Sequence, residues 1–218
     1  MIVIGYQGIG KSTVAQSNAV EGCYAACIRP DCFKLPEGMM EGYEEVLKNI
    51  SDNLKNQHIS TMVEVDEYFS RMIKAKNTVF PAFIDLESGN FWVNGERNYV
   101  WYMVYAKIAM ELSKQGFVVF TSSHEVVRTA FSLYLNEEEY KNEKVLVVHP
   151  SYDLKDQWIE RLESRYEASG LDKDYRALMN AKDRYEENIK ELEQSPFDTA
   201  IIKSMDYELF QIIADYLY

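Results

Sequence analysis

The chain has 218 residues, of which 47% are hydrophobic and 27% are charged, and its formal net charge is −12. This length supports one substantial core, or one core with a small subdomain, and the composition is typical of a soluble globular protein. The acidic balance argues against a nucleic-acid-binding surface, which needs a basic field, and the lack of an 18-residue apolar run argues against a membrane span.

A short apolar run at residues 2–4 predicts a buried strand. Gly5, Gly10, Lys11 and Ser12 then fit the G-x-x-x-x-G-K-[ST] phosphate loop. Glycines let the backbone curl until several N–H groups point at one phosphate, at the positive end of the following helix. Lys11 is expected to reach the β- and γ-phosphates, and Ser12 to ligate Mg²⁺. The alternative is a glycine-rich turn with a chance lysine, but the flanking strand and helix patterns favour a nucleotide-binding loop.

This loop sets expectations for the ligands and the compartment. We expect ATP and Mg²⁺ to bind here. Because the motif starts at the first residues, it leaves no room for a signal peptide, and this predicts a cytoplasmic protein. The residues expected to contact the nucleotide are Gly5, Gly8, Ile9, Gly10, Lys11, Ser12 and Thr13.

Residues 20–77 are predicted to form a mostly helical insertion in a single domain that spans residues 1–218. Apolar side chains recur at helical spacing over residues 39–56 and 60–76. The insertion is expected to bind the acceptor, with a protein partner as the alternative. A zinc site would need a fourth ligand nearby, so the cysteines are predicted to be free thiols in a reducing cytosol. They are Cys23, Cys27 and Cys32.

From residue 79 onward, apolar strands alternate with amphipathic helices. Such alternation predicts a parallel sheet covered by helices on both faces. Together with residues 2–4, it predicts an α/β protein with the P-loop NTPase fold: a five-stranded parallel sheet flanked by helices, a helical insertion and a helical lid. The expected elements are strands at 79–84, 117–120, 144–148 and 197–202, and helices at 98–115, 125–135, 154–168, 172–192 and 206–217.

Two acids, Asp85 and Glu87, follow the second predicted strand. Residues two apart share one face of a regular strand, so both are expected to face one site. One acid could hold Mg²⁺ through water while the other contacts the acceptor; the alternative is a pair of solvated loop acids. The strand at 117–120 has no acid at its end, which leaves Asp85 as the metal-side acid. His124 is expected to contact substrate or to cap the next helix, and Arg128 to face either the phosphates or solvent.

Arg161 and Arg165 lie four residues apart in a charge-rich helix, and therefore on one face of it. Two planar guanidinium groups there could clamp the β- and γ-phosphates and neutralise charge that develops on the transferred group. The alternative is surface salt bridges with acidic residues of the same helix. The segment 150–170 is accordingly the predicted lid.

These features resemble the nucleoside monophosphate kinase group, guanylate kinases in particular, over residues 1–16 and 79–218. The resemblance implies that Arg161 and Arg165 bind the ATP phosphates. It is carried by the Gly5–Ser12 loop, the Pro150-Ser151 pair, the Arg161-x-x-x-Arg165 spacing, the long helix near Arg176–Leu192 and the closing Phe197-Asp198 strand.

The stretch Phe83-Ile84-Asp85-Leu86-Glu87 is instead similar to the F-x-D-x-D strand of shikimate-type kinases. That similarity implies that the first acid works on the metal side and that the second holds the substrate. The chain as a whole resembles small P-loop kinase-like proteins, including phage-encoded ones.

The sequence therefore predicts an ATP- and Mg²⁺-dependent phosphotransferase, monomeric or homodimeric, that acts on a small-molecule acceptor, with nucleotides among the candidates. A second hypothesis is a nucleotide-binding regulatory or toxin-like module that uses binding or hydrolysis as a switch. A third is a kinase-like protein that binds nucleotide without turnover. The predicted catalytic residues are Lys11, Asp85, Glu87, Arg161 and Arg165, and the predicted metal-binding residues are Ser12 and Asp85.

Overall fold

The computed structural model describes part of the chain. The predicted insertion at residues 20–77, with its helices and cysteines, lies outside the described residues. So do residues 79–82 of the second predicted strand. The described residues are 1–17, 83–92, 96–97, 99–114 and 116–217.

Five strands form the core sheet: β1 (Ile2–Gly5), β2 (Phe83–Asp85), β3 (Val118–Thr121), β4 (Val145–Pro150) and β5 (Asp198–Ile202). They lie in the order β2-β3-β1-β4-β5, and every neighbouring pair is parallel. All residues of β1 to β4 are buried, as expected for parallel strands covered on both faces, whereas β5 is an edge strand with exposed residues. The predicted α/β class with five parallel strands is confirmed.

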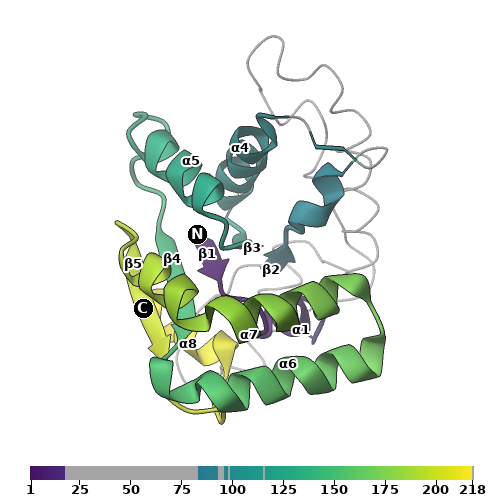
Figure 1. Ribbon diagram of the computed structural model, residues 1–218. Helices are drawn as coiled ribbons and strands as arrows, with labels where there is room; N and C mark the ends of the chain where they lie inside the picture. The colour runs from purple at the N-terminus through teal and green to yellow at the C-terminus, as the bar shows by residue number, and fades with distance from the viewer. Residues whose placement is uncertain (18–82, 93–95, 98, 115, 218) are drawn as a thin grey trace.

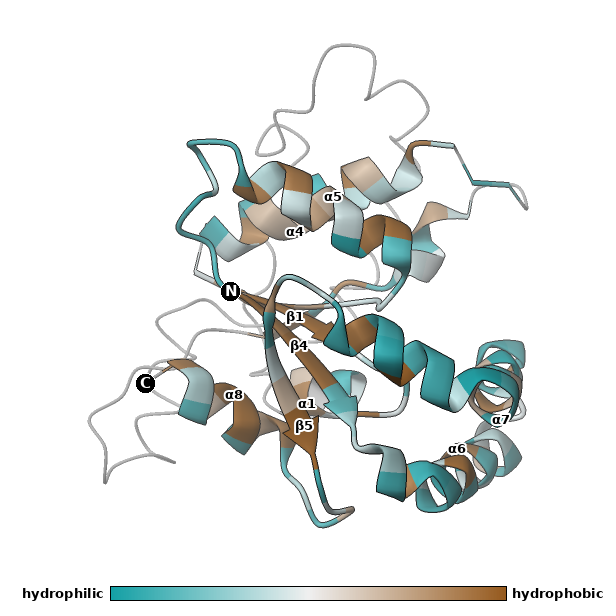
Figure 2. Ribbon diagram, turned by 60° about the vertical axis from the view of Figure 1, so that its left-hand side comes forward, coloured by the Kyte–Doolittle hydropathy of each residue, from teal (hydrophilic) through white to brown (hydrophobic). Residues whose placement is uncertain are grey.

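Helices cover both faces of this sheet. Figures 1 and 2 show α4 and α5 together on one side of the sheet, with α1 and α8 on the other side. The helices α6 and α7 form an adjacent pair whose outer surface is hydrophilic, whereas the strands beneath are hydrophobic (Figure 2). The bounds are α1 (Lys11–Ser17), α4 (Trp101–Lys114), α5 (Glu125–Leu135), α6 (Lys155–Ser169), α7 (Asp172–Glu193) and α8 (Leu209–Leu217), with short 3-10 helices η2 (Ser88–Phe91) and η3 (Tyr152–Leu154).

The helix and strand boundaries agree with the predictions to within a few residues. The predicted helix at 125–135 is confirmed as α5. The strand β4 extends to Pro150, because Pro150 still pairs with Ile202 of β5. The helix α8 begins at Leu209 rather than at residue 206, where the backbone N–H of Asp206 instead donates to Ser204 Oγ at 3.2 Å. None of the helices in the described ranges has the length and apolar composition needed to cross a bilayer.

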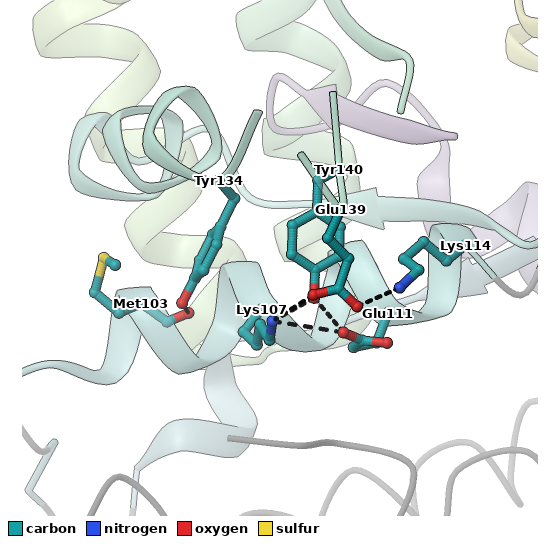
Figure 3. A network of polar contacts seen from close by, with 7 residues as sticks. All are labelled: Met103, Lys107, Glu111, Lys114, Tyr134, Glu139 and Tyr140. Atoms are coloured by element: carbon teal, nitrogen blue, oxygen red, sulfur yellow. Dashed lines mark hydrogen bonds and ion pairs between the residues drawn. The ribbon is translucent and has the colours of Figure 1, made fainter. Parts of the chain in front are cut away.

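A polar network joins α4 to the loop that follows α5 (Figure 3). The buried ammonium of Lys107 donates to Tyr140 Oη, which donates to Glu111. Lys107 also lies 3.9 Å from Glu139, which pairs with Lys114 at 2.5 Å. Burying an ammonium costs free energy unless it is paired, so this network fixes the loop against α4. None of these five residues lines the two cavities described below.

Candidate functional site

The glycine-rich loop, residues Gly5–Ser12, connects β1 to α1. Gly8 and Gly10 have φ angles of +85° and +94°, in the left-handed region that L side chains rarely adopt. A Cβ at Gly5 would lie 2.4 Å from Ile9 Cδ1 and 2.8 Å from Lys11 Cδ. The loop therefore curls back over the end of β1 in a way that its glycines permit and larger residues would obstruct.

Lys11 folds back over this loop. Its Nζ donates to the carbonyl oxygens of Gly5 at 2.9 Å and Tyr6 at 3.3 Å. Burial lowers the pKa of Lys11, while the carboxylates of Asp85 and Glu87 raise it. The ammonium is thus held at the carboxyl end of β1, where phosphate oxygens could replace the two carbonyls as its acceptors.

Asp85 and Ser12 are in direct contact. The Ser12 hydroxyl donates to Asp85 Oδ2 at 2.5 Å. Asp85 is the last residue of β2 and pairs in register with Phe120, whereas the sequence placed it after the strand. Burial raises the pKa of Asp85, while Lys11 and the Ser12 hydroxyl lower it.

The Ser12–Asp85 pair fits a magnesium ion that arrives with a phosphate ligand. Mg²⁺ prefers oxygen ligands and is often bound by one or two protein oxygens, with water and substrate phosphates completing its shell. A hydroxyl and a buried carboxylate at hydrogen-bond distance supply such oxygens. Among the residues described, no group of three or more His, Cys, Asp or Glu side chains could hold a metal ion by itself.

A cleft of about 610 Å³ brings the predicted site residues together. It is lined by segments far apart in the chain: the loop, the end of β2 and both helices of the α6–α7 pair. Of the eleven predicted site residues, Gly5 alone does not line it and lies beside a second cavity instead. The predicted residues that line the cleft are Gly8, Ile9, Gly10, Lys11, Ser12, Thr13, Asp85, Glu87, Arg161 and Arg165.

Glu87 faces the same cleft as Asp85 but is bound differently. Its Oε1 lies 3.5 Å from the ammonium of Lys173, on α7. Leu86, between the two acids, is buried, and its carbonyl accepts a 2.6 Å hydrogen bond from Tyr105 Oη. The pair of solvated loop acids considered as the alternative is therefore wrong for Asp85, which is buried.

Arg165 is paired across the helix pair and not within its own helix. Its Nη2 lies 2.5 Å from Asp174 Oδ1, on α7, and Ser169 Oγ donates to the other oxygen of Asp174 at 2.6 Å. Asp174 is 3% exposed, whereas the side chain of Arg165 is 44% exposed. A buried carboxylate thus anchors an arginine at the rim of the cleft. Asp174 could not be identified from the sequence, because its partner Arg165 lies nine residues away on the other helix of the α6–α7 pair.

Arg161 is held by aromatic rings. Its guanidinium carbon lies 5.3 Å from the ring centre of Trp158 and 5.4 Å from that of Tyr207, in the loop before α8. The two rings are nearly parallel, with centres 6.0 Å apart. Cation–π contacts of this kind restrict where a guanidinium can point. Both arginines therefore line the cleft, held by different neighbours.

The α6–α7 pair is hydrogen-bonded to the glycine-rich loop through Gln7. Trp158 Nε1 donates to the backbone oxygen of Gln7 at 2.9 Å, and Gln7 Nε2 donates to the carbonyl of Ala177 at 2.8 Å. A Cβ on Gly8 would lie 3.0 Å from Leu162 Cδ2. These contacts could not be predicted from the sequence. An apolar periodicity indicates that Trp158 and Leu162 are buried, but it does not indicate which segment they pack against.

The second cavity, of about 510 Å³, shares Lys11 and Gln7 with the cleft and is lined by the end of β3, α5 and α7. His124 precedes α5 without a capping hydrogen bond from its side chain, and its ring stands edge-on to Trp101 with centres 5.8 Å apart. Burial lowers the pKa of His124, and Arg97 and Arg128 lower it further. Arg128 is 8% exposed and lines this cavity, so it does not face solvent.

In comparisons with known proteins, no family model matches the chain, and no curated protein or solved structure matches it either.

Proposed function

We propose that this protein is an ATP- and Mg²⁺-dependent phosphotransferase, a P-loop kinase similar to the nucleoside monophosphate kinases, that acts on a small-molecule acceptor. One observation carries the proposal: the glycine-rich loop, Asp85 and two arginines of α6 line a single cleft. Ligands of parallel α/β folds gather at the carboxyl ends of the strands, and this cleft is lined by the last residue of β2 and by the loop that follows β1.

The loop supplies the groups that a polyphosphate needs. Its backbone curls around the mouth of the cleft, and the ammonium of Lys11 is held beside it by two carbonyls. Exchanging those carbonyls for phosphate oxygens gives Lys11 charge-assisted hydrogen bonds, which are stronger than neutral ones. Ser12 and Asp85 would hold the magnesium ion, Asp85 through water. When bound, the ion would neutralise charge on the phosphate oxygens.

The helix pair supplies the remaining charges and limits the access of water. Arg161 and Arg165 enter the cleft from α6 and would stabilise charge that develops on the transferred phosphoryl group. Glu87, 3.5 Å from the ammonium of Lys173, adds a second carboxylate to the cleft beside Asp85. Because α6 and α7 rest on the loop through Gln7, they form a wall of the cleft without a large movement.

The direct test is ATP binding by a Lys11→Ala variant, measured by isothermal titration calorimetry with Mg²⁺ present. Loss of the charge-assisted hydrogen bonds should weaken ATP binding by about 10- to 100-fold. Lys141→Ala is the matched control, because Lys141 is exposed and pairs with Glu138 far from the cleft. ATP affinity that is unchanged in Lys11→Ala would remove the assignment.

Turnover tests the arginines. Arg161→Ala and Arg165→Ala should each reduce turnover by about 10²-fold while changing ATP affinity less, because the guanidinium groups act on charge that develops during transfer. Arg176→Ala is the control, since Arg176 is exposed and pairs with Asp172 on the surface of α7. ADP formation in proportion to an added acceptor identifies a kinase, whereas slow acceptor-independent hydrolysis indicates the regulatory alternative.

A further inference from the structure

Three residues that line the second cavity carry buried polar atoms without a hydrogen-bond partner. Tyr6 Oη, Ser122 Oγ and Asn188 Nδ2 have no hydrogen-bond partner among the described residues, and all three residues line this cavity. The amides of Asn188 and Gln7 lie close enough to lower the pKa of Tyr6, which burial raises, but neither reaches its hydroxyl with hydrogen-bond geometry. Buried polar groups in folded proteins are nearly always hydrogen-bonded, so these three residues retain unused hydrogen-bonding capacity beside the cavity.

Three cationic side chains line this cavity, Lys11, Arg128 and Arg184, against two carboxylates, Glu125 and Glu191. Arg128 Nη1 donates to the carbonyl of Ser123, and the carboxylate of Glu191 lies 3.8 Å from Nη2, beyond hydrogen-bond distance. Glu191 is also 3.2 Å from Arg184, so one carboxylate faces two guanidinium groups. A guanidinium has five N–H donors in a planar fork that matches a phosphate or carboxylate. Arg128 therefore retains donors for an anionic group.

The wall opposite Arg128 contains a break in a helix. Asn180, Arg184 and Asn188 follow one another at four-residue spacing on the face of α7 that lines the cavity. Arg184 has φ −134° and ψ 23°, which are not helical values, in the middle of this face. Irregular turns inside long helices occur frequently at functional sites. The break lies at the cavity and changes the direction of the helix between Asn180 and Asn188.

Lys11 lines both cavities, so a phosphoryl group held in the first cleft and a molecule held in the second would meet at its ammonium. Resting on the proposed phosphotransferase function, we propose that the second cavity is the acceptor site and takes a small polyhydroxylated metabolite that carries one phosphate or carboxylate. Its volume of about 510 Å³ is within the range of small-molecule sites. The hydroxyl and amide groups bind the acceptor's hydroxyls, and Arg128 binds its anionic group.

The oxygen of an acceptor hydroxyl forms a bond to the γ-phosphorus of ATP, and the bond from that phosphorus to the bridging oxygen of ADP breaks. ADP leaves with the bonding electron pair. The hydroxyl proton passes to the imidazole of His124, which lines the same cavity.

The test measures ADP formation by the full chain with Mg²⁺ and ATP, using paired acceptors with and without an anionic group. The pairs are ribose and ribose 5-phosphate, glycerol and glycerol 3-phosphate, and glucose and gluconate. The charged member of at least one pair should have a kcat/KM about tenfold or more above that of its uncharged partner, since hydrogen bonds to charged groups are the stronger ones. The pairs also distinguish a phosphate from a carboxylate as the bound group.

Two variants connect this preference to the cavity. Arg128→Gln should raise the KM of the charged acceptor by about tenfold or more without changing that of its uncharged partner, and Arg176→Gln is the matched control. Ser122→Ala removes a hydroxyl that makes no hydrogen bond of good geometry, although it lies near enough to Tyr105 to lower the pKa of that phenol, so the melting temperature should change little while the acceptor KM rises about three- to tenfold. Ser122→Ala therefore keeps the test decisive even if Arg128→Gln fails to fold.

Three results would overturn the inference: equal use of charged and uncharged acceptors, no acceptor in the panel that stimulates ADP formation, or unchanged acceptor KM in both variants. ATP binding by the wild-type protein is measured in parallel. If ATP does not bind, the proposed function itself fails. If ATP binds and acceptor use is insensitive to Arg128 and Ser122, the acceptor site alone is wrongly placed.

Discussion

Replacing Gly8 with alanine tests how tightly α6 rests on the glycine-rich loop. At a φ of +85°, a Cβ costs about 1–2 kcal/mol of backbone strain. The new Cβ would also lie 3.0 Å from Leu162 Cδ2 and 3.2 Å from Trp158 Nε1. Both side chains are buried, so each must give way by a few tenths of an ångström, and overpacking of this kind costs about 1–3 kcal/mol. We expect Gly8→Ala to lower the free energy of unfolding by about 2–5 kcal/mol.

Gly10→Ala is the matched control within the same loop. Its φ of +94° gives similar backbone strain, but no described atom lies within 4 Å of the added Cβ. The control should therefore lose about 1–2 kcal/mol, and the difference between the two variants isolates the contact with α6.

Urea unfolding of both variants measures this difference, and the melting temperature should fall by about 2–4 °C for each kcal/mol lost. Leu162 and Trp158 lie on the same helix as Arg161 and Arg165, so their displacement in Gly8→Ala should also disturb the two arginines, and turnover should fall together with stability. Equal losses of stability in Gly8→Ala and Gly10→Ala would show that α6 does not rest on the loop, and the account of the helix pair as a wall of the cleft would be wrong.

Two further predictions concern buried carboxylates. Burial raises the pKa of the Asp85 carboxyl above its ordinary value of 3.8. The native protein therefore keeps the carboxyl proton at pH values where the unfolded chain has lost it. The stability that this proton provides declines as the pH rises through the native pKa. Urea unfolding across the acidic range measures the free energy of unfolding of the wild type and of Asp85→Asn. The value for the wild type minus that for Asp85→Asn should decrease with rising pH, and a difference that stays constant would contradict this. Asp174→Asn should lower the free energy of unfolding by about 1–2 kcal/mol, because its partner Arg165 is 44% exposed and solvent weakens the pair. It should also lower turnover, since Arg165 loses its anchor, and wild-type values for both quantities would show that the pair has neither role.

Much of the fold could be predicted because its strands are buried on both faces. Such strands appear as continuous apolar runs, as at residues 118–120 and 145–148. The order of the strands could not be predicted in this way. It depends on pairings such as Ile2 with Val119 and Ile2 with Val145, between residues more than a hundred positions apart, which periodicity does not encode.

The candidate site was predictable where its geometry is local. The glycine-rich loop was found because the spacing of Gly5, Gly10 and Lys11 itself specifies a conformation. The contacts of Arg165 and Arg128 are not local in this sense. The sequence offered Arg165 acidic partners on its own helix, and the structure gives it Asp174 on the next one. For Arg128, its position in the helix alone could not show whether the side chain faces a buried cavity or solvent.

The attachment of the helix pair to Gln7 has a consequence for how ligands are exchanged. The backbone oxygen of Gln7 binds α6 and its side chain binds α7, so swinging both helices away as one rigid body would break the two bonds together. A movement confined to the distal tip around Gly170, which carries Arg165 and Lys173 on either side of the turn, would leave both bonds in place and break the contacts of Asp174 with Arg165 and Ser169 instead. In the proposed kinase, opening of that tip would let nucleotide leave without moving the rest of the helix pair.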